Sequence, residues 1–244
     1  MKIACVIPAR YASTRLPGKP LADIAGKPMI QRVYEQVAKA SHPDMVIVAT
    51  DDNRVYDVVK AFGGTVAMTR ADHLTGTDRL AEVTRAYDDI DVIINVQGDE
   101  PLIEPTLIDE LATLFEADGT IQMATVGAPL LEDEYNEPSA VKVVCNKKGD
   151  AMYFSRSLIP FPRNAFVNEP LKHIGIYAYT REFLLTYADM EPTPAELTES
   201  LEQLRALENG VPIRVIKTKA RFVGVDTPED LRAVNEIFKQ KFNA

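Results

Sequence analysis

The chain begins with a short apolar run, Ile3-Ala4-Cys5-Val6-Ile7, which leads into a polar loop, Pro8-Ala9-Arg10-Tyr11-Ala12-Ser13-Thr14-Arg15-Leu16-Pro17-Gly18-Lys19-Pro20-Leu21. A continuous apolar run of this length is typical of a strand that is buried on both faces. The loop contains three cations, Arg10, Arg15 and Lys19, together with hydroxyl groups and a Pro-Gly turn. Cationic tips, hydroxyls and backbone N–H groups can all bind phosphate oxygens, although an ordinary solvated loop is the simpler alternative. This stretch therefore predicts a first buried strand with an anion site at its end.

Strand-like and helix-like patterns alternate through the first half of the chain. Apolar runs recur at residues 46–49, 66–68 and 92–96, and helical spacing of apolar residues covers 29–40, 53–62, 77–87 and 105–117. This alternation predicts an α/β fold with a doubly wound, mostly parallel sheet, in which the loops after the strands meet at one edge. The polar loops 8–21, 51–52 and 97–101 all follow expected strands and therefore fall at that edge.

The second half of the chain is expected to be richer in strands. Strand patterns lie at residues 123–126, 141–144, 151–154, 173–179 and 213–218, and helices are expected at 181–188, at 195–208 and after Pro228. Segment 146–150 has a hairpin signal, and the Pro-rich segment 159–163 fits either a lid or a subunit contact. Thr227 or Asp226 is expected to cap the last helix. We therefore expect one domain, 1–244, with a β-rich extension inserted over about residues 123–180.

Composition excludes several classes of protein. The 244 residues carry a net charge of −9 and are 46% hydrophobic and 26% charged, which is typical of an ordinary soluble globular protein rather than a nucleic-acid-binding protein. No apolar run approaches the roughly 20 residues that span a bilayer, and the first residues lack a secretory signal. We therefore expect a cytoplasmic protein without membrane or nucleic-acid partners. Cys5 and Cys145 lie in apolar runs and are expected to be reduced and buried.

Several familiar catalytic motifs are missing from the sequence. It contains no G-x-x-x-x-G-K-[ST], no G-x-G-x-x-G and no G-x-S-x-G, which disfavours a P-loop, a dinucleotide-binding fold and an α/β hydrolase. Cys and His residues lack the spacing of a metal motif. His42, His73 and His173 have no nucleophile at a recognisable spacing, so the sequence gives no support for proton transfer by histidine.

Two carboxylates stand at expected strand and helix ends. Asp99 follows an apolar strand in a Gly-Asp-Glu-Pro turn, and Asp226 precedes the last helix. Two carboxylates beside a phosphate-binding loop form the arrangement that Mg²⁺ prefers, because Mg²⁺ binds oxygen ligands and substrate phosphates together. The alternatives are that Asp99 is only a turn residue and that Asp226 is only a helix cap.

Seven segments of the chain carry a family resemblance. They are 7–21, Met68-Thr69-Arg70-Ala71-Asp72-His73, Asn95-Val96-Gln97-Gly98-Asp99-Glu100-Pro101, Tyr153-Phe154-Ser155-Arg156, Lys172-His173-Ile174-Gly175-Ile176-Tyr177, Ser200-Leu201-Glu202-Gln203-Leu204-Arg205 and Gly224-Val225-Asp226-Thr227-Pro228-Glu229-Asp230-Leu231. With these motifs the chain closely resembles the 3-deoxy-manno-octulosonate cytidylyltransferases, from the first strand to about Leu231. Small departures, Leu74-Thr75 before Gly76 and Asp78 where the family has Glu, concern only the base pocket.

The resemblance implies a nucleotide-diphospho-sugar transferase type of fold, a homodimer and a reaction. The enzyme would transfer CMP from CTP to the 2-hydroxyl of 3-deoxy-D-manno-octulosonate (Kdo), releasing pyrophosphate, for lipopolysaccharide biosynthesis. Its β-rich part would serve substrate binding and dimerisation. The triphosphate would be held by Arg10, Ser13 and Lys19. Cytidine would be lined by Pro8, Ala9, Thr69, Arg70, Gly76 and Thr77. Kdo would contact Arg79, Gln97, Arg156, His173, Tyr177, Glu202 and Gln203. Mg²⁺ would be held by Asp99 and Asp226, which with Arg10 and Lys19 would form the catalytic set.

Two alternatives remain open from the sequence. The same cytidylyl transfer could serve a related sugar acid such as 8-amino-Kdo, or the chain could be a nucleotide-binding scaffold without catalysis. A scaffold would be expected to lack an aspartate or a loop cation, and none is missing here. The partner of Arg15 cannot be named from the sequence.

Overall fold

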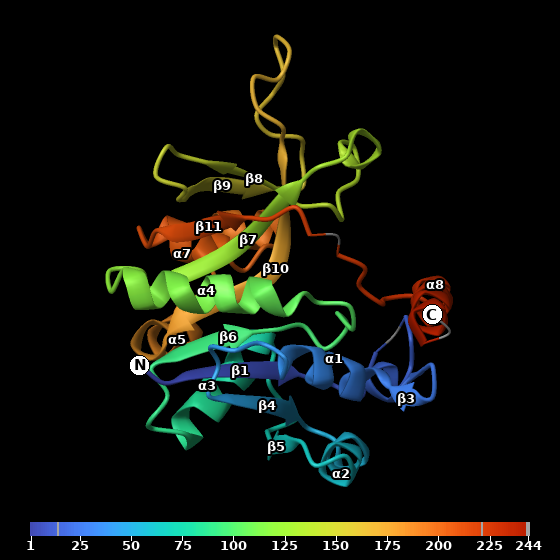
Figure 1. The fold of residues 1–244 in the computed structure, drawn as a ribbon. Helices are drawn as coiled ribbons and strands as arrows, with labels where there is room; N and C mark the ends of the chain where they lie inside the picture. The colour runs from blue at the N-terminus through green and yellow to red at the C-terminus, as the bar shows by residue number, and fades with distance from the viewer. Residues whose placement is uncertain (14, 221, 243–244) are drawn as a thin grey trace. The chain divides into compact units, whose positions relative to one another are not determined.

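The computed structural model describes residues 1–13, 15–220 and 222–242, without the side chains of residues 241 and 242. Thr14 of the opening loop therefore lies outside the described residues. The chain forms two compact units, one of residues 1–113 with 222–244 and the other of residues 114–221 (Figure 1). The expectation of a single domain stays a prediction, and each unit is described by itself below.

The first unit is built on four parallel strands. They lie in the order β6-β1-β4-β5 and comprise β1 (Ile3–Pro8), β4 (Met45–Thr50), β5 (Thr65–Met68) and β6 (Val92–Asn95). The central strands β1, β4 and β6 are almost wholly buried, as continuous apolar runs predict. The predicted α/β class with a mostly parallel sheet is confirmed, and the strands differ from the expected ranges by one residue at most ends.

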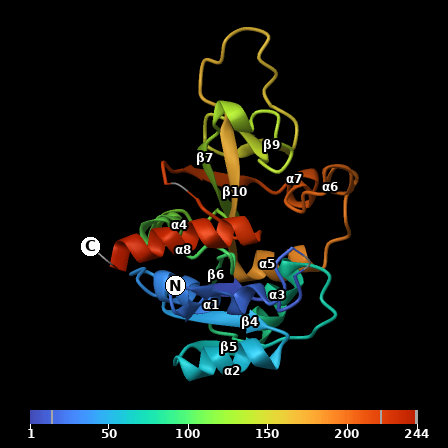
Figure 2. The ribbon, with the colours of Figure 1, turned by 90° about the vertical axis from the view of Figure 1, so that its right-hand side faces the viewer.

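The helices of this unit also follow the expected periodicity. They are α1 (Met29–Val37), α2 (Asn53–Ala61), α3 (Gly76–Ala86) and α8 (Pro228–Phe242), while α4 (Pro105–Ala117) crosses the boundary between the units. A short ribbon of β2 (Asp23–Ile24) and β3 (Lys27–Pro28) precedes α1. Asn235 binds the backbone of Asp23 and Ala25, so α8 docks on this ribbon and lies beside α1 (Figures 1 and 2).

The start of α3 differs in detail from the sequence prediction. Thr77 was expected to begin this helix, but the N-cap is Thr75, whose hydroxyl accepts from the N–H of Asp78 while the Asp78 carboxylate accepts from the N–H of Thr75. This reciprocal capping box satisfies two backbone donors and is therefore more favourable than a cap made by the hydroxyl of Thr77 alone. Thr77 is consequently buried in the first turn.

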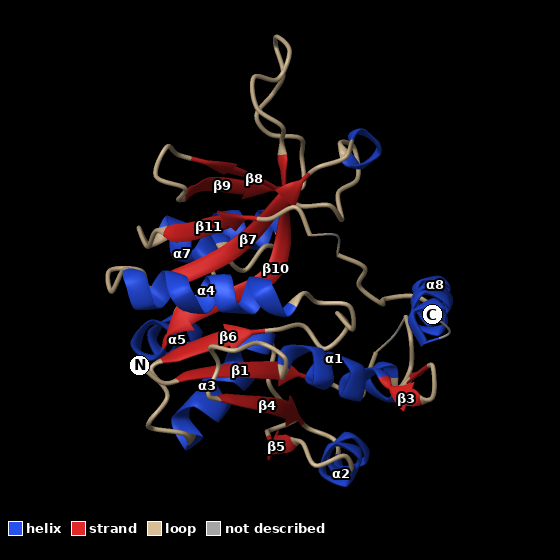
Figure 3. Cartoon of the chain, viewed as in Figure 1, coloured by secondary structure: helices blue, strands red, loops and turns tan. Residues whose placement is uncertain are grey.

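The second unit is dominated by strands, as Figure 3 shows. Its strands are β7 (Met123–Pro129), β8 (Lys142–Cys145), β9 (Ala151–Ser155), β10 (Leu171–Thr180) and β11 (Ile213–Lys217). β7 pairs in antiparallel fashion with β10 and in parallel with β11, and β8 joins β10 to β9. The predicted hairpin is present between β8 and β9, where Asn146 accepts from the N–H groups of Lys148 and Asp150.

One long helix, expected over residues 195–208, is instead two helices. They are α6 (Pro194–Glu199) and α7 (Leu204–Glu208), and α5 (Arg181–Ala188) precedes them. The break is at Ser200, whose backbone is left-handed at φ 52 and ψ 50, a conformation that ends a helix. No Gly or Pro stands at this position, so the helical spacing of apolar residues predicted one continuous helix. Glu202 and Gln203 consequently stand in a turn.

Both cysteines are free thiols, as expected, but Cys145 is less buried than the sequence predicted. Cys5 is buried, Cys145 is half-buried, and both thiols are free. Burial raises the pKa of both thiols, which keeps them protonated and unreactive. None of the helices in the described part of the chain is long and apolar enough to cross a membrane.

Candidate active site

Lys19 and two aspartates form a charged cluster at the strand ends of the first unit. The Nζ of Lys19 donates to Oδ2 of Asp99 at 2.6 Å and to Oδ1 of Asp226 at 3.0 Å. Burial alone would lower the pKa of Lys19, but the two carboxylates raise it, and the net pKa lies above its ordinary value. The ammonium therefore stays charged, and both carboxylates converge on one cation.

Local structure places Lys19 in this position. Lys19 begins a short 3₁₀ turn, Lys19–Leu21, which follows Gly18 in the left-handed conformation at φ 67. A Cβ at Gly18 would also lie 3.1 Å from the hydroxyl of Tyr11, so both backbone conformation and space favour glycine there. Pro20 is buried and anchors the turn.

Asp226 is held at the cluster because another residue caps α8. The hydroxyl of Thr227 accepts from the N–H of Asp230, and the Asp230 carboxylate accepts from the N–H groups of Asp226 and Thr227. The side chain of Asp226 thus contributes no cap and faces cations instead. Arg15, whose partner the sequence could not supply, binds Asp226 at 3.1 Å.

The loop that carries Asp99 packs tightly against the end of β1. A Cβ at Gly98 would lie 2.7 Å from the carbonyl oxygen of Pro8, so only glycine allows this approach. The N–H of Val225 donates to the carbonyl of Asp99 at 2.9 Å, which joins the segments that carry the two aspartates. The carboxylates are therefore fixed by backbone contacts on both sides.

Residues expected at the nucleotide lie along the same strand ends. Arg10 donates to the carbonyls of His73 at 2.8 Å and Thr75 at 3.0 Å, which ties the opening loop to the start of α3 and to Gly76. The carbonyl of Ala9 accepts from the hydroxyl of Thr50 at 2.7 Å. The hydroxyl of Ser13 accepts from a backbone N–H at 3.3 Å. The opening loop is thereby joined to the segment between β5 and α3 at the edge of the sheet.

Arg79 lies inside the first unit rather than on its surface. Its side chain is 0% exposed, donates to Asp51 at 2.9 Å and contacts the hydroxyl of Thr69. Its Nε has no hydrogen-bond partner among the described residues. Arg70, in contrast, is exposed and pairs with Asp72. A direct contact of Arg79 with a sugar acid, which stays a prediction, would require this packing to open.

The remaining residues expected at Kdo belong to the second unit, apart from Gln97, which lies after β6. The His173 ring packs against Phe154, with ring centroids 5.0 Å apart, and against Tyr177, at 5.3 Å. Burial lowers the pKa of His173 to about 3 and raises that of Tyr177, so both rings are neutral at pH 7. The hydroxyl of Thr125, which sequence reasoning did not single out, lies 3.0 Å from Nε2 of His173.

Arg156 is held at the helix break around Ser200, and Gln203 lies in the turn that follows the break. Arg156 donates to the carbonyls of Pro138, Glu199 and Ser200, at 2.9, 2.7 and 3.2 Å. The Glu199 carboxylate accepts from the N–H of Arg156 at 3.0 Å, a supporting role that the sequence did not reveal. Gln203 is 5% exposed, and its Nε2 has no partner among the described residues. Buried donors without partners are rare and favour a ligand oxygen at this point.

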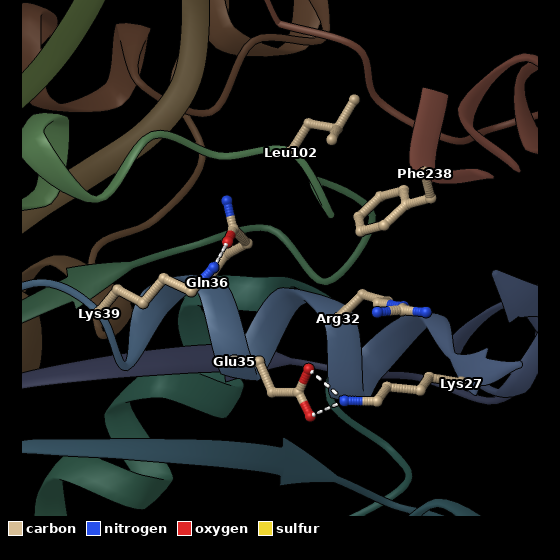
Figure 4. A pocket seen from close by; sticks show the side chains of 7 residues that line it. All are labelled: Lys27, Arg32, Glu35, Gln36, Lys39, Leu102 and Phe238. Carbon is tan, nitrogen blue, oxygen red and sulfur yellow. Dashed lines mark hydrogen bonds and ion pairs between the residues drawn. The ribbon is translucent and has the colours of Figure 1, made fainter. Parts of the chain in front are cut away.

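A hollow in the first unit lies apart from the residues that the sequence predicts for the site. It has a volume of about 390 Å³ and lies between α1, Leu102 and α8 (Figure 4). Two of its cations make contacts within the unit, because Lys27 pairs with Glu35 at 2.7 Å and Arg32 donates to two backbone carbonyls and lies over the ring of Phe238. The hollow therefore lies where α1 and α8 pack in the same unit, and its third cation, Lys39, contacts the amide of Gln36.

Comparisons with known proteins identify the family. The cytidylyltransferase family matches residues 4–217. The chain belongs to this family. It is 56% identical to the 3-deoxy-manno-octulosonate cytidylyltransferase of Syntrophotalea carbinolica, over 95% of this chain and 96% of that one. It is also 56% identical to the protein of the same name from Geobacter metallireducens, over 97% of both chains.

Solved structures agree with this assignment. A CMP:2-keto-3-deoxy-manno-octonic acid synthetase complexed with CTP matches with a TM-score of 0.95 and 49% identity, over 99% of this chain and 100% of that chain. The 4-diphosphocytidyl-2C-methyl-D-erythritol synthase of Anaerococcus prevotii has a TM-score of 0.65 at 11% identity, with coverage of 98% and 96%, and shows the shared fold alone. The resemblance read from the sequence and the predicted fold type are therefore confirmed, and the chain is a nucleotidyltransferase.

Proposed function

We propose that this protein transfers CMP from CTP to the 2-hydroxyl of Kdo and releases pyrophosphate. Family membership fixes the reaction class, and the named relatives support Kdo as the acceptor. They give no support to the alternative acceptor 8-amino-Kdo. The observation that carries the proposal is the cluster in which Lys19, beside Asp99 and Asp226, stands in the opening loop. It supplies both the cation and the carboxylates that a nucleoside triphosphate reaction needs.

We assign the nucleotide to the first unit. Arg10, Ser13 and Lys19 hold the triphosphate, and the charged Lys19 ammonium stabilises negative charge on the leaving pyrophosphate. The contacts of Arg10 with two carbonyls orient its guanidinium without neutralising it, so its charge remains for phosphate. The cytidine moiety is lined by Pro8, Ala9, Thr69, Arg70, Gly76 and Thr77.

We assign the acceptor chiefly to the second unit. The guanidinium of Arg156 has five N–H donors, three of which donate to backbone carbonyls, so two are left for the Kdo carboxylate. The neutral His173 and Tyr177 rings and the amide of Gln203 suit the hydroxyl groups of a sugar. The residues that we assign to Kdo binding are Arg79, Gln97, Arg156, His173, Tyr177, Glu202 and Gln203.

We further propose Mg²⁺ as the cofactor, held by Asp99 and Asp226. The described residues contain no group of three or more His, Cys, Asp or Glu side chains suited to a metal. Two converging carboxylates nevertheless fit Mg²⁺, because this ion usually takes one or two carboxylates and completes its shell with phosphate oxygens and water. When bound, the ion would supply charge neutralisation at the reacting phosphate. Lys19 would then turn from the carboxylates to the triphosphate.

The direct test is a pyrophosphate-release assay with CTP, Kdo and Mg²⁺, repeated with UTP, with ATP and with 8-amino-Kdo. Asp99→Asn is expected to lose about 10²–10³ in turnover, the scale of one electrostatic catalytic group, while its circular dichroism stays unchanged. Asp118→Asn removes a carboxylate that binds the backbone of a turn in the second unit, and it serves as the matched control with unchanged turnover. Near-normal activity of Asp99→Asn would remove the metal role, and no turnover of Kdo by the wild type would overturn the acceptor.

We propose a homodimer whose contact includes the loop between β9 and β10. Phe161 is 84% exposed and Val167 is 95% exposed, and the loop lines a hollow of about 890 Å³ together with β8 and β9. Exposed apolar side chains beside a hollow favour a protein partner. Sedimentation should give a dimer for the wild type and a monomer for Phe161→Asp.

A cytoplasmic location and a place in lipopolysaccharide assembly follow from CTP and Kdo as substrates and belong to the same proposal.

A further inference from the structure

The hydroxyl of Thr125 lies at an irregularity in the second unit's sheet. Thr125 is on β7 and fully buried, and the register between β7 and β10 shifts between Ile174 and Tyr177. Its Oγ1 lies 2.8 Å from the carbonyl oxygen of Ile176, 3.2 Å from that of Ile174 and 3.0 Å from Nε2 of His173. One hydroxyl thus meets two bulge carbonyls and one imidazole nitrogen.

Counting hydrogens decides which group donates in each contact. A threonine hydroxyl has one hydrogen to donate and lone pairs that accept, whereas a carbonyl oxygen can only accept. The short contact between Thr125 and the carbonyl of Ile176 therefore needs the hydroxyl hydrogen, shared with the carbonyl of Ile174. No hydrogen is left for His173, so its Nε2 must carry the proton and donate to Oγ1.

This donation fixes the other nitrogen of the ring. With the proton on Nε2, a neutral imidazole has a lone pair on Nδ1 and can accept one hydrogen bond there. The ring is neutral because burial lowers the pKa of His173 to about 3. Phe154 and Tyr177 pack against it and oppose rotation, and no other hydrogen bond of this ring is found among the described residues. Nδ1 is thereby available as an acceptor in a fixed direction.

We propose that Thr125 is a positioning residue that holds His173 as the Nε2–H tautomer, so that Nδ1 accepts a hydrogen bond from a hydroxyl of the sugar-acid substrate. The role rests on the proposed function for the identity of that substrate. It adds a chemical rule for the acceptor, because a lone pair at Nδ1 selects a hydroxyl or another donor at that point. A carbonyl or a carboxylate oxygen would be repelled there.

The tautomer itself can be measured without turnover. Nitrogen-15 NMR of histidine-labelled protein distinguishes the two neutral tautomers, and His173→Gln assigns the signal of His173. We expect the Nε2–H form in the wild type and in Thr125→Ser, which keeps the hydroxyl. In Thr125→Val we expect a mixture of tautomers, because the hydroxyl that selects one form is gone. An Nδ1–H signal in the wild type, or an unchanged single tautomer in Thr125→Val, would overturn the proposal.

Kinetics then connect the tautomer to the substrate. Thr125→Val is expected to raise the KM for Kdo about tenfold, the effect of one hydrogen bond, with the KM for CTP unchanged, and Thr125→Ser should restore it. Thr84→Val removes a buried hydroxyl from α3 and should change neither KM. Equal rises in both KM values would overturn the positioning role. A wild-type Nε2–H tautomer in a protein that turns over no Kdo would refute the proposed function alone and leave the role of Thr125 supported.

Discussion

Lowering the pH should destabilise the protein through His173. Burial lowers the pKa of this histidine from 6.5 to about 3 in the folded chain. Below pH 6.5 the unfolded chain takes up a proton on the imidazole, whereas the folded chain does not until the pH nears 3. The unfolded state therefore binds more protons in this window, so the free energy of unfolding falls as the pH falls.

The size of the effect follows from the two pKa values. One group that is protonated only in the unfolded state changes the free energy of unfolding by about 1.4 kcal/mol per pH unit. Between pH 6.5 and pH 5 this amounts to about 2 kcal/mol, an upper value because the residue as a whole is half-buried. The surroundings offer no compensation, since the ring contacts Phe154, Tyr177 and the hydroxyl of Thr125 rather than a carboxylate.

Urea denaturation followed by circular dichroism measures the effect, with wild type and His173→Gln compared at pH 7.5 and pH 5. Other groups titrate in both proteins, so their contributions cancel in the difference between the two variants. The stability advantage of the wild type over His173→Gln should shrink by about 1–2 kcal/mol at the lower pH. An advantage that stays constant, or grows, would show that the folded state protonates His173 readily and that the ring is not sealed from water.

Three further substitutions test how the two units are built. Arg79→Met removes a buried cation, leaves the partly buried carboxylate of Asp51 unpaired and should cost about 3 kcal/mol in urea denaturation, whereas Arg70→Met removes an exposed ion pair and should leave the urea midpoint unchanged. Gly98→Ala should cost about 1–3 kcal/mol because its Cβ would meet a backbone oxygen, while Gly119→Ala, with open space around it, should change stability by less than about 0.5 kcal/mol. Ser200→Gly relieves a left-handed backbone, so calorimetry should show a melting temperature above that of the wild type, and a lower one would contradict the strain.

Sequence patterns predicted the sheet because strands that are buried on both faces consist mostly of apolar residues. The runs that became β1, β4 and β6 are apolar apart from Asn95, and a run of this composition and length is typical of a buried strand. Helix ends were less determinate, since several residues near each end can cap. Thr75 could have been preferred to Thr77 from sequence, because Asp78 stands three residues after Thr75 and completes a capping box. The break at Ser200 had no such signal, as serine is only rarely left-handed.

The charged cluster depends on a choice of helix cap that local sequence patterns cannot predict. Asp226 and Thr227 are both good capping residues, and the sequence alone gives no reason to choose between them. The choice depends on cations far away in the chain, since Lys19 is 207 residues and Arg15 is 211 residues from Asp226. With Thr227 as the cap, the Asp226 carboxylate is left to bind those cations, whereas a capping Asp226 would have turned its oxygens to the helix. A hydroxyl in the position after Asp226 therefore serves the site indirectly, because it takes over the capping role and so leaves the carboxylate to the opening loop.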